Sequence, residues 1–358
     1  FAKDFVPYGM QRDALVVSAL TELGIAAKQV GSAYAVEPGS VRKADGTPYA
    51  VFTPFSKIWM QIGWPAPFAT PRVSWSGAPA IATEPIPSDP PCAAQLPEAS
   101  EEAAWNTWEE FRATGLDTYN DNRNNPDIAG TSTLSPYLRF GLIHPRSLLA
   151  ELNETKAHAV YRSELGWREF YADVLFHQPR TMRENLQRKM DAIKLDTDQR
   201  AHDRFALWCA GQTGYPIVDA GMKQLVATGW MHNRVRMIVA SFLVKDLHLP
   251  WQWGAKFFMQ HLVDGDIASN QHGWQWTAGT GTDASPYFRI FNPISQGIKF
   301  DPQGNYVRHW IPELRDLPND EVHEPWTAGL LNPYLEPIVD HAVERTESLL
   351  RYKQLSVS

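Results

Sequence analysis

The stretch PIVDAGMKQLVATGWMHNRVRMIVASFLVKDL, residues 216–247, contains two consecutive helical patterns and indicates which fold class the chain adopts. The first pattern begins at Pro216, a residue favoured in the first helical turn, and ends at Gly229, a residue favoured just past a helix end. The second begins near His232 and ends before Pro250, which cannot continue a helix. Two such patterns in succession predict a mainly α architecture.

Helical patterns continue on the N-terminal side of this stretch. They cover residues 101–115, 145–152 and 162–177. Together with residues 216–247 they predict that residues 100–358 form a mostly α domain.

The first hundred residues have a different character. Residues 9–24 show helical periodicity that ends at a glycine, and the short apolar pieces at residues 26–30 and 34–36 resemble strands, so residues 1–64 are expected to form a partial α/β layer. Nine prolines between residues 65 and 97 prevent regular structure. Residues 65–99 are therefore expected to be a long connector between two domains.

The bulk composition places the chain among globular proteins. Of its 358 residues, 44% are hydrophobic and 20% are charged, and no apolar run is long enough to cross a bilayer. The chain has two cysteines, Cys92 and Cys209, which form no CxxC pair and give no disulfide framework, and this favours a reducing compartment. We expect a cytoplasmic monomer without membrane contact. The sequence begins at Phe1 without a signal-peptide pattern, so its natural N-terminus is expected to be missing.

The net charge of −7 is unevenly distributed. Residues 81–127 hold ten acidic and two basic residues, so the rest of the chain is close to neutral. Residues 223–256 hold five basic residues and one acidic residue, and we interpret this run as a candidate surface for phosphate groups. A solvated helix face is the alternative interpretation.

The helical segment RSELGWREFY places four chemically unusual residues on one face. Glu164, Trp167, Arg168 and Tyr171 follow the i, i+3, i+4, i+7 spacing, and this set is too polar for a core stripe. An ion pair between Glu164 and Arg168 on an ordinary helix surface would also explain the pattern. We favour a ligand pocket, because an exposed tryptophan usually has a partner.

The next candidate face lies in GWMHNRVRM. Asn233, Arg236 and Met237 share one side of the predicted helix, a combination suited to a ligand that is part polar and part apolar, whereas Arg234 is expected to project elsewhere, toward a phosphate. The histidines of this region form no metal-ligand pattern, so no metal is expected.

The segment GTSTLSPYL, residues 130–138, combines four hydroxyl groups with a helix start at Pro136. Hydroxyl and free backbone N–H groups at a helix start can bind phosphate oxygens, although the same residues also serve as ordinary helix caps.

The segment DGDIASNQHGWQWTAGTG, residues 264–281, lacks both the alternation of a strand and the one-sided apolar stripe of a helix. It fits no strand and fits a helix only weakly, and its two tryptophans are expected either in the core, on an irregular loop, or around a ligand.

Six segments together resemble the photolyase and cryptochrome family, in particular the class I bacterial photolyases that repair cyclobutane pyrimidine dimers. They are TSTLSPYLRFG, ELGWREFY, GQTGYPIVDAGMKQLVATGWMHNRVRM, SFLVKDL, DGDIASNQHGWQW and TGTDASPYFRIFNPISQGIKFD. The resemblance runs from about Trp105 to the C-terminus and implies an all-helical FAD-binding domain. Residues 1–64 resemble only the later part of the family's Rossmann-like α/β antenna domain.

The resemblance implies that residues 264–281 surround the isoalloxazine ring of FAD. Asp264 would pair with Arg236, Asp266 would lie at the pyrimidine edge of the ring, and Asn270 would face flavin N5. The other FAD-binding residues that the resemblance implies are Tyr119, Thr131, Ser132, Thr133, Leu134, Ser135, Arg168 and Gly265.

The resemblance also implies residues for electron transfer and for DNA. Trp274, Trp251 and Trp208, in that order, would form a path from the flavin to the surface. The residues around the dimer would be Glu164, Trp167, Asn233, Met237 and Trp276, and the DNA contacts would be Arg123, Glu164, Tyr171, Asn233, Arg234 and Gln296.

The implied activity is light-driven repair of UV-damaged DNA, in which excited, reduced FAD gives an electron to a flipped-out dimer. A cryptochrome-like light sensor is the alternative, and Asn270 together with the dimer-contacting set argues against it. Repair of (6-4) photoproducts would call for a histidine-rich pocket, where this sequence offers Asn233 and Met237. A second, antenna chromophore could be methenyltetrahydrofolate or deazaflavin, or be absent.

Overall fold

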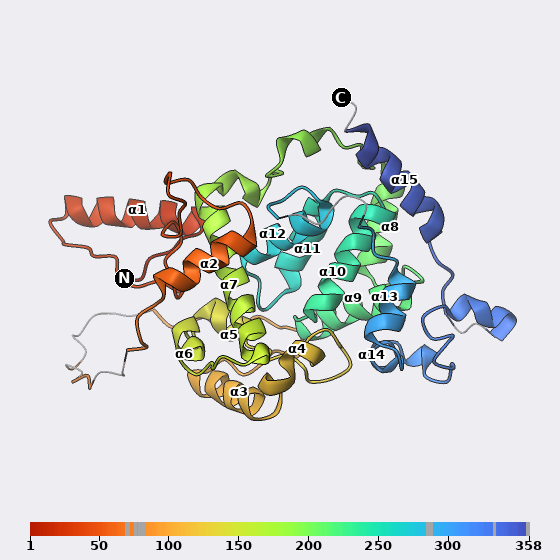
Figure 1. Ribbon diagram of the computed structural model, residues 1–358, viewed down its shortest axis with the longest axis horizontal. Coiled ribbons are helices and arrows are strands. Elements are labelled where there is room, and N and C mark those ends of the chain that lie inside the picture. The colour runs from red at the N-terminus through yellow and green to blue at the C-terminus, as the bar shows by residue number, and fades with distance from the viewer. Residues whose placement is uncertain (69–71, 75–76, 78–83, 284–288, 332–333, 356–358) are drawn as a thin grey trace.

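The computed structural model describes all residues except 69–71, 75–76, 78–83, 284–288, 332–333 and 356–358. The described residues form a helical body (Figure 1). Its α-helices are α1 Pro7–Glu22, α2 Phe52–Ile62, α3 Glu101–Thr114, α4 Tyr119–Asn122, α5 Ser135–Phe140, α6 Pro145–Ala150, α7 Lys156–His177, α8 Gln199–Cys209, α9 Pro216–Thr228, α10 Asn233–Ser241, α11 Trp251–His261, α12 Ile267–Ala278, α13 Pro293–Phe300, α14 Asn305–Trp310 and α15 His341–Gln354. The predicted mainly α fold class is confirmed.

Proline and glycine mark helix ends where the sequence indicated them. Helix α9 begins at Pro216 and is followed by Gly229 in the left-handed conformation, with φ of 65°. Helix α3 ends before Gly115. Helix α10 continues into a π-helical turn, Phe242–Asp246, and π-helical turns are frequent near functional sites.

The prediction of strands at residues 26–30 and 34–36 is wrong. The described residues form only isolated bridges, one between Ala2 and Val30 and one between Arg42 and Pro48. The backbone N–H groups of Ala35 and Val36 donate to the carboxylate of Glu169 instead, at 3.0 Å for Val36. This side chain on α7 satisfies the donors that a neighbouring strand would have used.

The same carboxylate fixes the segment before the connector to α7. The indole Nε1 of Trp59 on α2 also donates to Glu169, at 2.5 Å. Apolar side chains of this segment, including Val36 and Phe55, share one buried cluster with Trp108 and Phe170. Residues 35–59 and the helices α3 to α7 are therefore built around a common core.

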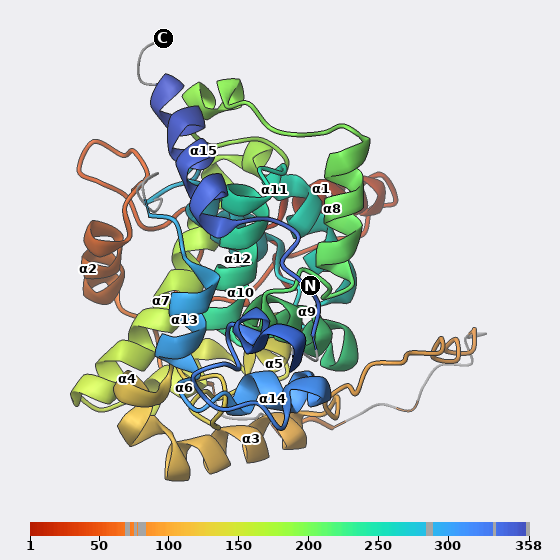
Figure 2. The ribbon, with the colours of Figure 1, turned by 90° about the vertical axis from the view of Figure 1, so that its right-hand side faces the viewer.

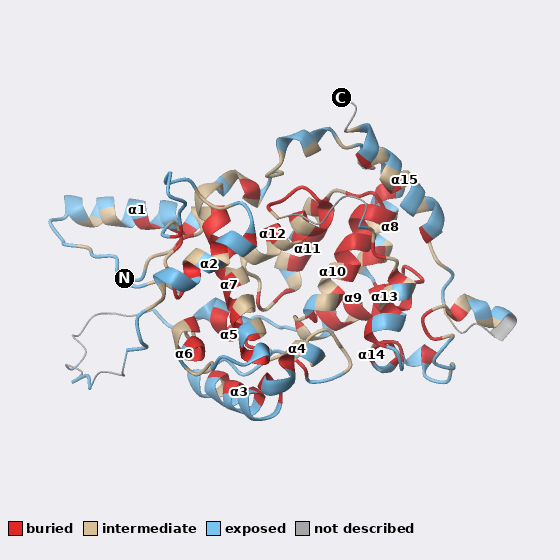
Figure 3. Ribbon diagram, in the orientation of Figure 1, coloured by how far each residue is buried: buried red, intermediate tan, exposed pale blue. Residues whose placement is uncertain are grey.

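A second buried cluster lies among the helices α8 to α11 and α14. Figure 3 shows that α7 and α9 to α12 carry most of the buried positions, whereas α1, α3 and α15 turn large faces to solvent. The described parts of the connector run outside this body (Figure 2), and the backbone N–H of Gln95 donates to the carbonyl of Ala227 at 2.8 Å. Among the helices that the structure describes, none is long and apolar enough to cross a membrane.

Most of residues 264–281 form a helix, α12, which the sequence pattern supported only weakly. Asp266 caps its first turn by accepting from the N–H of Ser269 at 2.7 Å, and Gly279 ends it with φ of 75°. The helix packs against α7, α10 and α11, so buried residues lie on several of its sides, polar Gln271 and Gln275 among them. A helix enclosed in this way has no single apolar stripe, and this is why the sequence pattern missed it.

Candidate functional site

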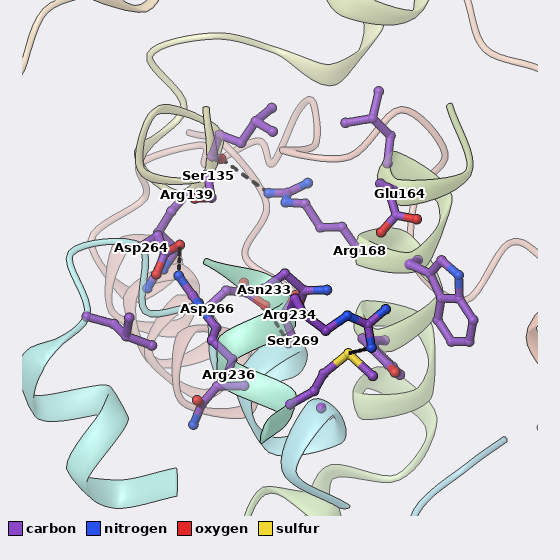
Figure 4. Close-up of a pocket in the computed structure, with 18 of the residues that line it drawn as sticks. Ser135, Arg139, Glu164, Arg168, Asn233, Arg234, Arg236, Asp264, Asp266 and Ser269 are labelled. Atoms are coloured by element: carbon purple, nitrogen blue, oxygen red, sulfur yellow. Dashed lines mark hydrogen bonds and ion pairs between the residues drawn. The ribbon is translucent and has the colours of Figure 1, made fainter. Parts of the chain in front are cut away.

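A cavity of about 560 Å³ lies between α7, α10, α12 and the segment that leads into α5 (Figure 4). This volume falls in the range of sites for organic ligands and cofactors. The predicted site residues that line the cavity are Tyr119, Arg123, Ser132, Leu134, Ser135, Glu164, Trp167, Arg168, Tyr171, Asn233, Arg234, Arg236, Met237, Asp264, Asp266, Asn270, Trp274 and Trp276. Thr131, Thr133, Gly265, Gln296, Trp208 and Trp251 do not belong to this lining.

The polar face predicted for α7 points into the cavity, but its two charges do not pair with each other. Glu164 bonds Arg123, with 2.6 Å between Oε1 and Nη1. Arg168 donates to the backbone carbonyls of Ala33 at 3.0 Å and Leu138 at 3.2 Å. The structure therefore does not contain the Glu164–Arg168 ion pair that was the alternative explanation for this face.

The environment of the cavity affects the protonation of Glu164. Burial raises the pKa of its carboxyl above the ordinary value, while the positive charge of Arg123 and its hydrogen bond oppose that rise. Trp167, one helical turn further along, stacks on Phe52 with 3.9 Å between ring centroids. An acid that can take up a proton thus lies beside an aromatic wall.

On α10, Asn233, Arg236 and Met237 line the cavity as their spacing predicted. The expectation that Arg234 projects elsewhere is wrong. Its Nη2 donates to Asn124 Oδ1 at 2.7 Å and its Nη1 lies 3.6 Å from Met237 Sδ, so the guanidinium lies along the cavity wall. The guanidinium lies there because the carbonyl oxygen of Asn124 replaces hydrogen bonds to water that the guanidinium loses in the cavity.

The opposite side of the cavity carries an ion pair. Arg236 Nη2 donates to Asp264 Oδ2 at 2.7 Å, and both side chains are labelled in Figure 4. The other oxygen, Asp264 Oδ1, is buried and has no hydrogen-bond partner among the described residues. A buried carboxylate oxygen without a partner can accept from a bound polar molecule.

Three more residues hold this side in place. Arg139 Nε donates to the carbonyl of Gly265 at 2.7 Å, so Gly265 shapes the site through its backbone. Asn270 Nδ2 donates to the carbonyl of Ala255 at 3.0 Å and to Gln271. Its amide is therefore oriented by its neighbours before any ligand arrives.

The hydroxyl-rich segment lies at the start of α5. Ser132 accepts from the hydroxyl of Tyr161 at 3.0 Å, and Ser135 accepts from Trp230 Nε1 at 3.2 Å. Thr133 has φ of 50°, a left-handed backbone that is rare for threonine. This strained turn places Ser132 and Ser135 on the cavity wall while Thr133 is exposed.

The structure changes the expected order of the tryptophans. The rings of Trp274 and Trp208 lie next to each other, with centroids 6.1 Å apart. Trp208 is fully buried, so it cannot be the surface end of a path. Trp251 is also buried, and its Nε1 donates to Asn185 at 2.8 Å. No ring contact joins Trp251 to Trp274 or Trp208 in the described part of the chain.

Other rings continue from Trp208 toward the surface. Phe205 stacks on Trp208 with centroids 5.8 Å apart, and Trp253 lies 5.4 Å from Phe205. Trp253 in turn stacks at 4.5 Å on His202, which is exposed. These rings come from α8 and α11 and form a continuous series from the cavity to solvent.

The basic run at residues 223–256 does not form one surface. Arg236 faces Asp264 in the cavity, and Lys245 is buried with its Nζ 3.6 Å from the ring centroid of Tyr352. Lys256 is exposed on α11. Sequence position alone could not separate these residues, because consecutive helices turn them in different directions.

Sequence reasoning missed several cavity residues, Arg139 and Ser269 among them. Arg139 lies in the last turn of the short helix that begins beside Pro136. Ser269 and Gly273 lie three and seven residues after Asp266, on one face of α12. Had residues 267–278 been read as a helix, this spacing would have identified both.

The lining fits a large, partly anionic, aromatic ligand such as FAD. Three guanidinium groups, from Arg139, Arg168 and Arg236, line the cavity together with two serine hydroxyls and three tryptophan rings. Cations and hydroxyls suit phosphate oxygens, and the unpartnered Asp264 Oδ1 suits a ring N–H or hydroxyl donor.

Comparisons with known proteins agree with this chemistry. Residues 161–354 match a family described as the FAD binding domain of DNA photolyase, and residues 1–72 match a family described as DNA photolyase. A deoxyribodipyrimidine photo-lyase of Vibrio cholerae is 41% identical over 98% of this chain and 78% of its own length. The Escherichia coli protein of the same name is 43% identical over 88% of this chain and 70% of its own length.

Solved structures give the same relationship. A class III photolyase from Agrobacterium tumefaciens superposes with a TM-score of 0.87 at 35% identity, covering 100% of this chain and 79% of that one. A Synechocystis cryptochrome superposes with a TM-score of 0.83 at 29% identity, covering 98% of this chain and 78% of that one.

Proposed function

The chain belongs to the DNA photolyase family and is a FAD-binding deoxyribodipyrimidine photo-lyase, and from this premise we propose how its cavity repairs DNA in light. The damaged site is a cyclobutane pyrimidine dimer, flipped out of the duplex into the cavity. One observation carries the proposal: a single cavity joins the Arg236–Asp264 pair to the polar and aromatic faces of α7 and α10.

The side formed by α12 and the segment before α5 holds FAD. Asp264, kept in place by Arg236, accepts from the cofactor, while Asn270 presents its amide and Ser132 and Ser135 bind phosphate oxygens. When bound and fully reduced, FAD would supply the light-excited electron that splits the dimer and would take this electron back once the two pyrimidines separate. The protein orients the cofactor and keeps water away from it.

The side formed by α7 and α10 receives the dimer. Stacking requires flat apolar walls, which Trp167 and Trp276 provide, and the edges of the bases require hydrogen-bond partners, which Glu164 and Asn233 provide. Met237 supplies an adaptable apolar contact. Arg123 and Arg234 bind backbone phosphates beside the lesion, because a guanidinium matches phosphate geometry.

Electrons for the resting flavin pass through the ring series of α12, α8 and α11. Trp274 donates first and Trp208 refills Trp274. Trp253 then refills Trp208 across the ring of Phe205, which is not itself oxidised, and Trp253 is the partly exposed end that a thiol reductant from solution restores. Trp251 remains the alternative intermediate between Trp274 and the surface.

Repair of a defined oligonucleotide tests the proposal. The purified protein, loaded with FAD and chemically reduced, should restore the ultraviolet absorbance of a thymine-dimer oligonucleotide under blue light and not in the dark. Glu164→Gln, which can still donate a hydrogen bond, should keep most of the quantum yield, whereas Glu164→Ala should lose much of it. Absence of light-dependent repair by a fully flavin-loaded protein would reject the assignment.

The similarity to the Synechocystis cryptochrome keeps a light-sensing function as the second candidate. The same assay separates the two, since a sensor would bind FAD and change its redox state in light without splitting dimers. We also propose that the protein acts as a monomer, which light scattering on the FAD-loaded protein would establish.

A further inference from the structure

Arg123 and Glu164 form an ion pair at the part of the cavity assigned to the dimer. Arg123 directly follows α4, and its guanidinium lies over the Tyr119 ring, 5.4 Å from Cζ to the centroid. Its Nη1 lies 2.6 Å from Glu164 Oε1 on α7. The side chains keep 23% and 32% of their surface exposed, so a ligand in the cavity can reach both.

Among the described residues, the side chain of Arg123 has no acceptor other than Glu164. Its neighbour Arg234 differs in this respect, because Asn124 Oδ1 accepts from both its Nε and its Nη2. Arg168 is likewise held by two backbone carbonyls. Of these three guanidinium groups, Arg123 is the one that can leave for a phosphate by giving up a single partner.

We propose that Arg123 couples DNA binding to protonation of Glu164: a phosphate beside the lesion takes the guanidinium, and the released carboxylate takes up a proton that it then shares with the dimer. This inference rests on the proposed function, because it requires a DNA backbone at Arg123. No covalent bond changes; one ion pair replaces another, and one proton enters from solvent.

The physical reason is the cost of an isolated charge in an enclosed site. A carboxylate that loses its cation while the dimer excludes water is strongly destabilised, and it neutralises rather than remain ionised. Burial already raises the pKa of Glu164, and Arg123 is the opposing influence on that pKa. When the Arg123 guanidinium moves to the phosphate, its lowering effect on the pKa of Glu164 is lost and the raising effect of burial remains.

The other charged or titratable groups around Glu164 do not replace this role. Arg168 and Arg234 keep their own acceptors. Burial raises the pKa of Tyr119 and of Tyr171, so both phenols stay neutral near pH 7. Burial lowers the pKa of His232 to about 4, so this ring is neutral as well and takes up no proton in that range.

Calorimetry measures the proton directly. Binding of a thymine-dimer oligonucleotide to the FAD-loaded protein is measured at pH 7 in buffers of different ionisation enthalpy, which gives the number of protons taken up. We expect about one proton for the native protein, and an affinity that falls about tenfold per pH unit over the range in which Glu164 is ionised only in the free protein. Infrared difference spectra should gain a protonated-carboxyl band on binding.

Three variants separate the coupling from simple loss of affinity. Glu164→Gln should show no proton uptake and no new carboxyl band. Arg123→Ala should bind more weakly and take up fewer protons than the native protein at the same pH, since without Arg123 the effect of burial already raises the pKa of Glu164 before DNA binds. Arg234→Ala is the matched control: it loses a DNA-facing guanidinium but should retain the full proton uptake.

Zero uptake by a native protein that binds and repairs dimers would overturn the coupling and leave the repair function standing. Full uptake by Arg123→Ala would also overturn it, because the proton would then not depend on the guanidinium. A native protein that neither binds nor repairs dimers would instead reject the proposed function. Circular dichroism and flavin content confirm that each variant is folded.

Discussion

At the scale of single residues, the cavity depends on charges that are held in pairs. Asp264 is almost fully enclosed, with 3% of its side chain exposed, whereas Arg236 keeps 25%. The acid therefore depends on its cation more than the cation depends on the acid. This asymmetry makes Asp264 the informative position for substitution.

We expect Asp264→Ala to purify with little FAD. Removing one partner of an enclosed ion pair lowers the free energy of unfolding by about 3 to 5 kcal/mol. This is an upper value here, because the remaining Arg236 is partly exposed. The flavin-to-protein absorbance ratio after gel filtration measures the effect. Asp320→Ala, an exposed acid far along the chain, serves as the control. A full flavin complement in Asp264→Ala would contradict the assignment.

At the scale of elements, helices with a clear helical pattern or with proline and glycine at their ends could be predicted, and α12 could not. Helix α9 has Pro216 and Gly229 at its ends, so its limits were visible in the sequence. Helix α12 is capped by Asp266, but it is buried on several sides and shows no one-sided stripe. The candidate strand at residues 34–36 failed because Glu169, more than a hundred residues later, accepts its hydrogen bonds, whereas residues 26–30 form only the isolated bridge between Ala2 and Val30.

The features of the site also divide into those that could be predicted from the sequence and those that could not. Residues on α7 and α10 could be grouped from the sequence, because helical spacing fixes which side chains share a face. Contacts between separate segments could not be predicted. Neither the Arg123–Glu164 ion pair nor the Arg234–Asn124 hydrogen bond produces a pattern in the local sequence. The contact between Trp208 and Trp274 likewise depends on how α8 packs against α12.

The ring series across α12, α8 and α11 gives a second prediction. Trp208→Phe and Trp253→Phe should each slow light-driven reduction of oxidised FAD by at least about tenfold, because phenylalanine is much harder to oxidise than tryptophan. Transient absorption of the tryptophan radical and steady-state photoreduction measure this. Both variants should repair dimers normally once chemically reduced. Should Trp251→Phe block photoreduction while Trp253→Phe does not, the path runs through Trp251 instead.

At the scale of the whole molecule, an acidic protein binds an acidic partner through a local field. The net charge is −7, yet Arg123 and Arg234 line one cavity, and the adjacent acidic excess of residues 81–127 lies mainly on exposed positions of α3 and the connector. Net charge therefore describes solubility better than it describes the binding site.

DNA affinity should fall as salt rises. Each phosphate contact contributes a slope of about −0.9 in a plot of log affinity against log salt concentration, so Arg234→Ala should reduce the slope by about one. Fluorescence anisotropy with a dimer-containing duplex measures it. Lys245→Met is the matched control, because the buried Lys245 should leave the slope unchanged. An affinity that does not respond to salt would remove the phosphate contacts from the proposal.

The hydrogen bonds of the Glu169 carboxylate predict what happens when the chain is cut within the connector. Because it binds Ala35, Val36 and Trp59, and because Phe55 packs in the same core as Trp108, the two sides of the connector adhere without the peptide that joins them. Limited proteolysis within residues 84–97 should therefore give two fragments that co-elute on gel filtration and keep their flavin. Glu169→Gln should weaken that association, and fragments that separate freely would show that the shared core is too weak to hold them. If the two fragments stay associated, the enzyme can be produced as two separate polypeptides, and its repair activity then depends on their association.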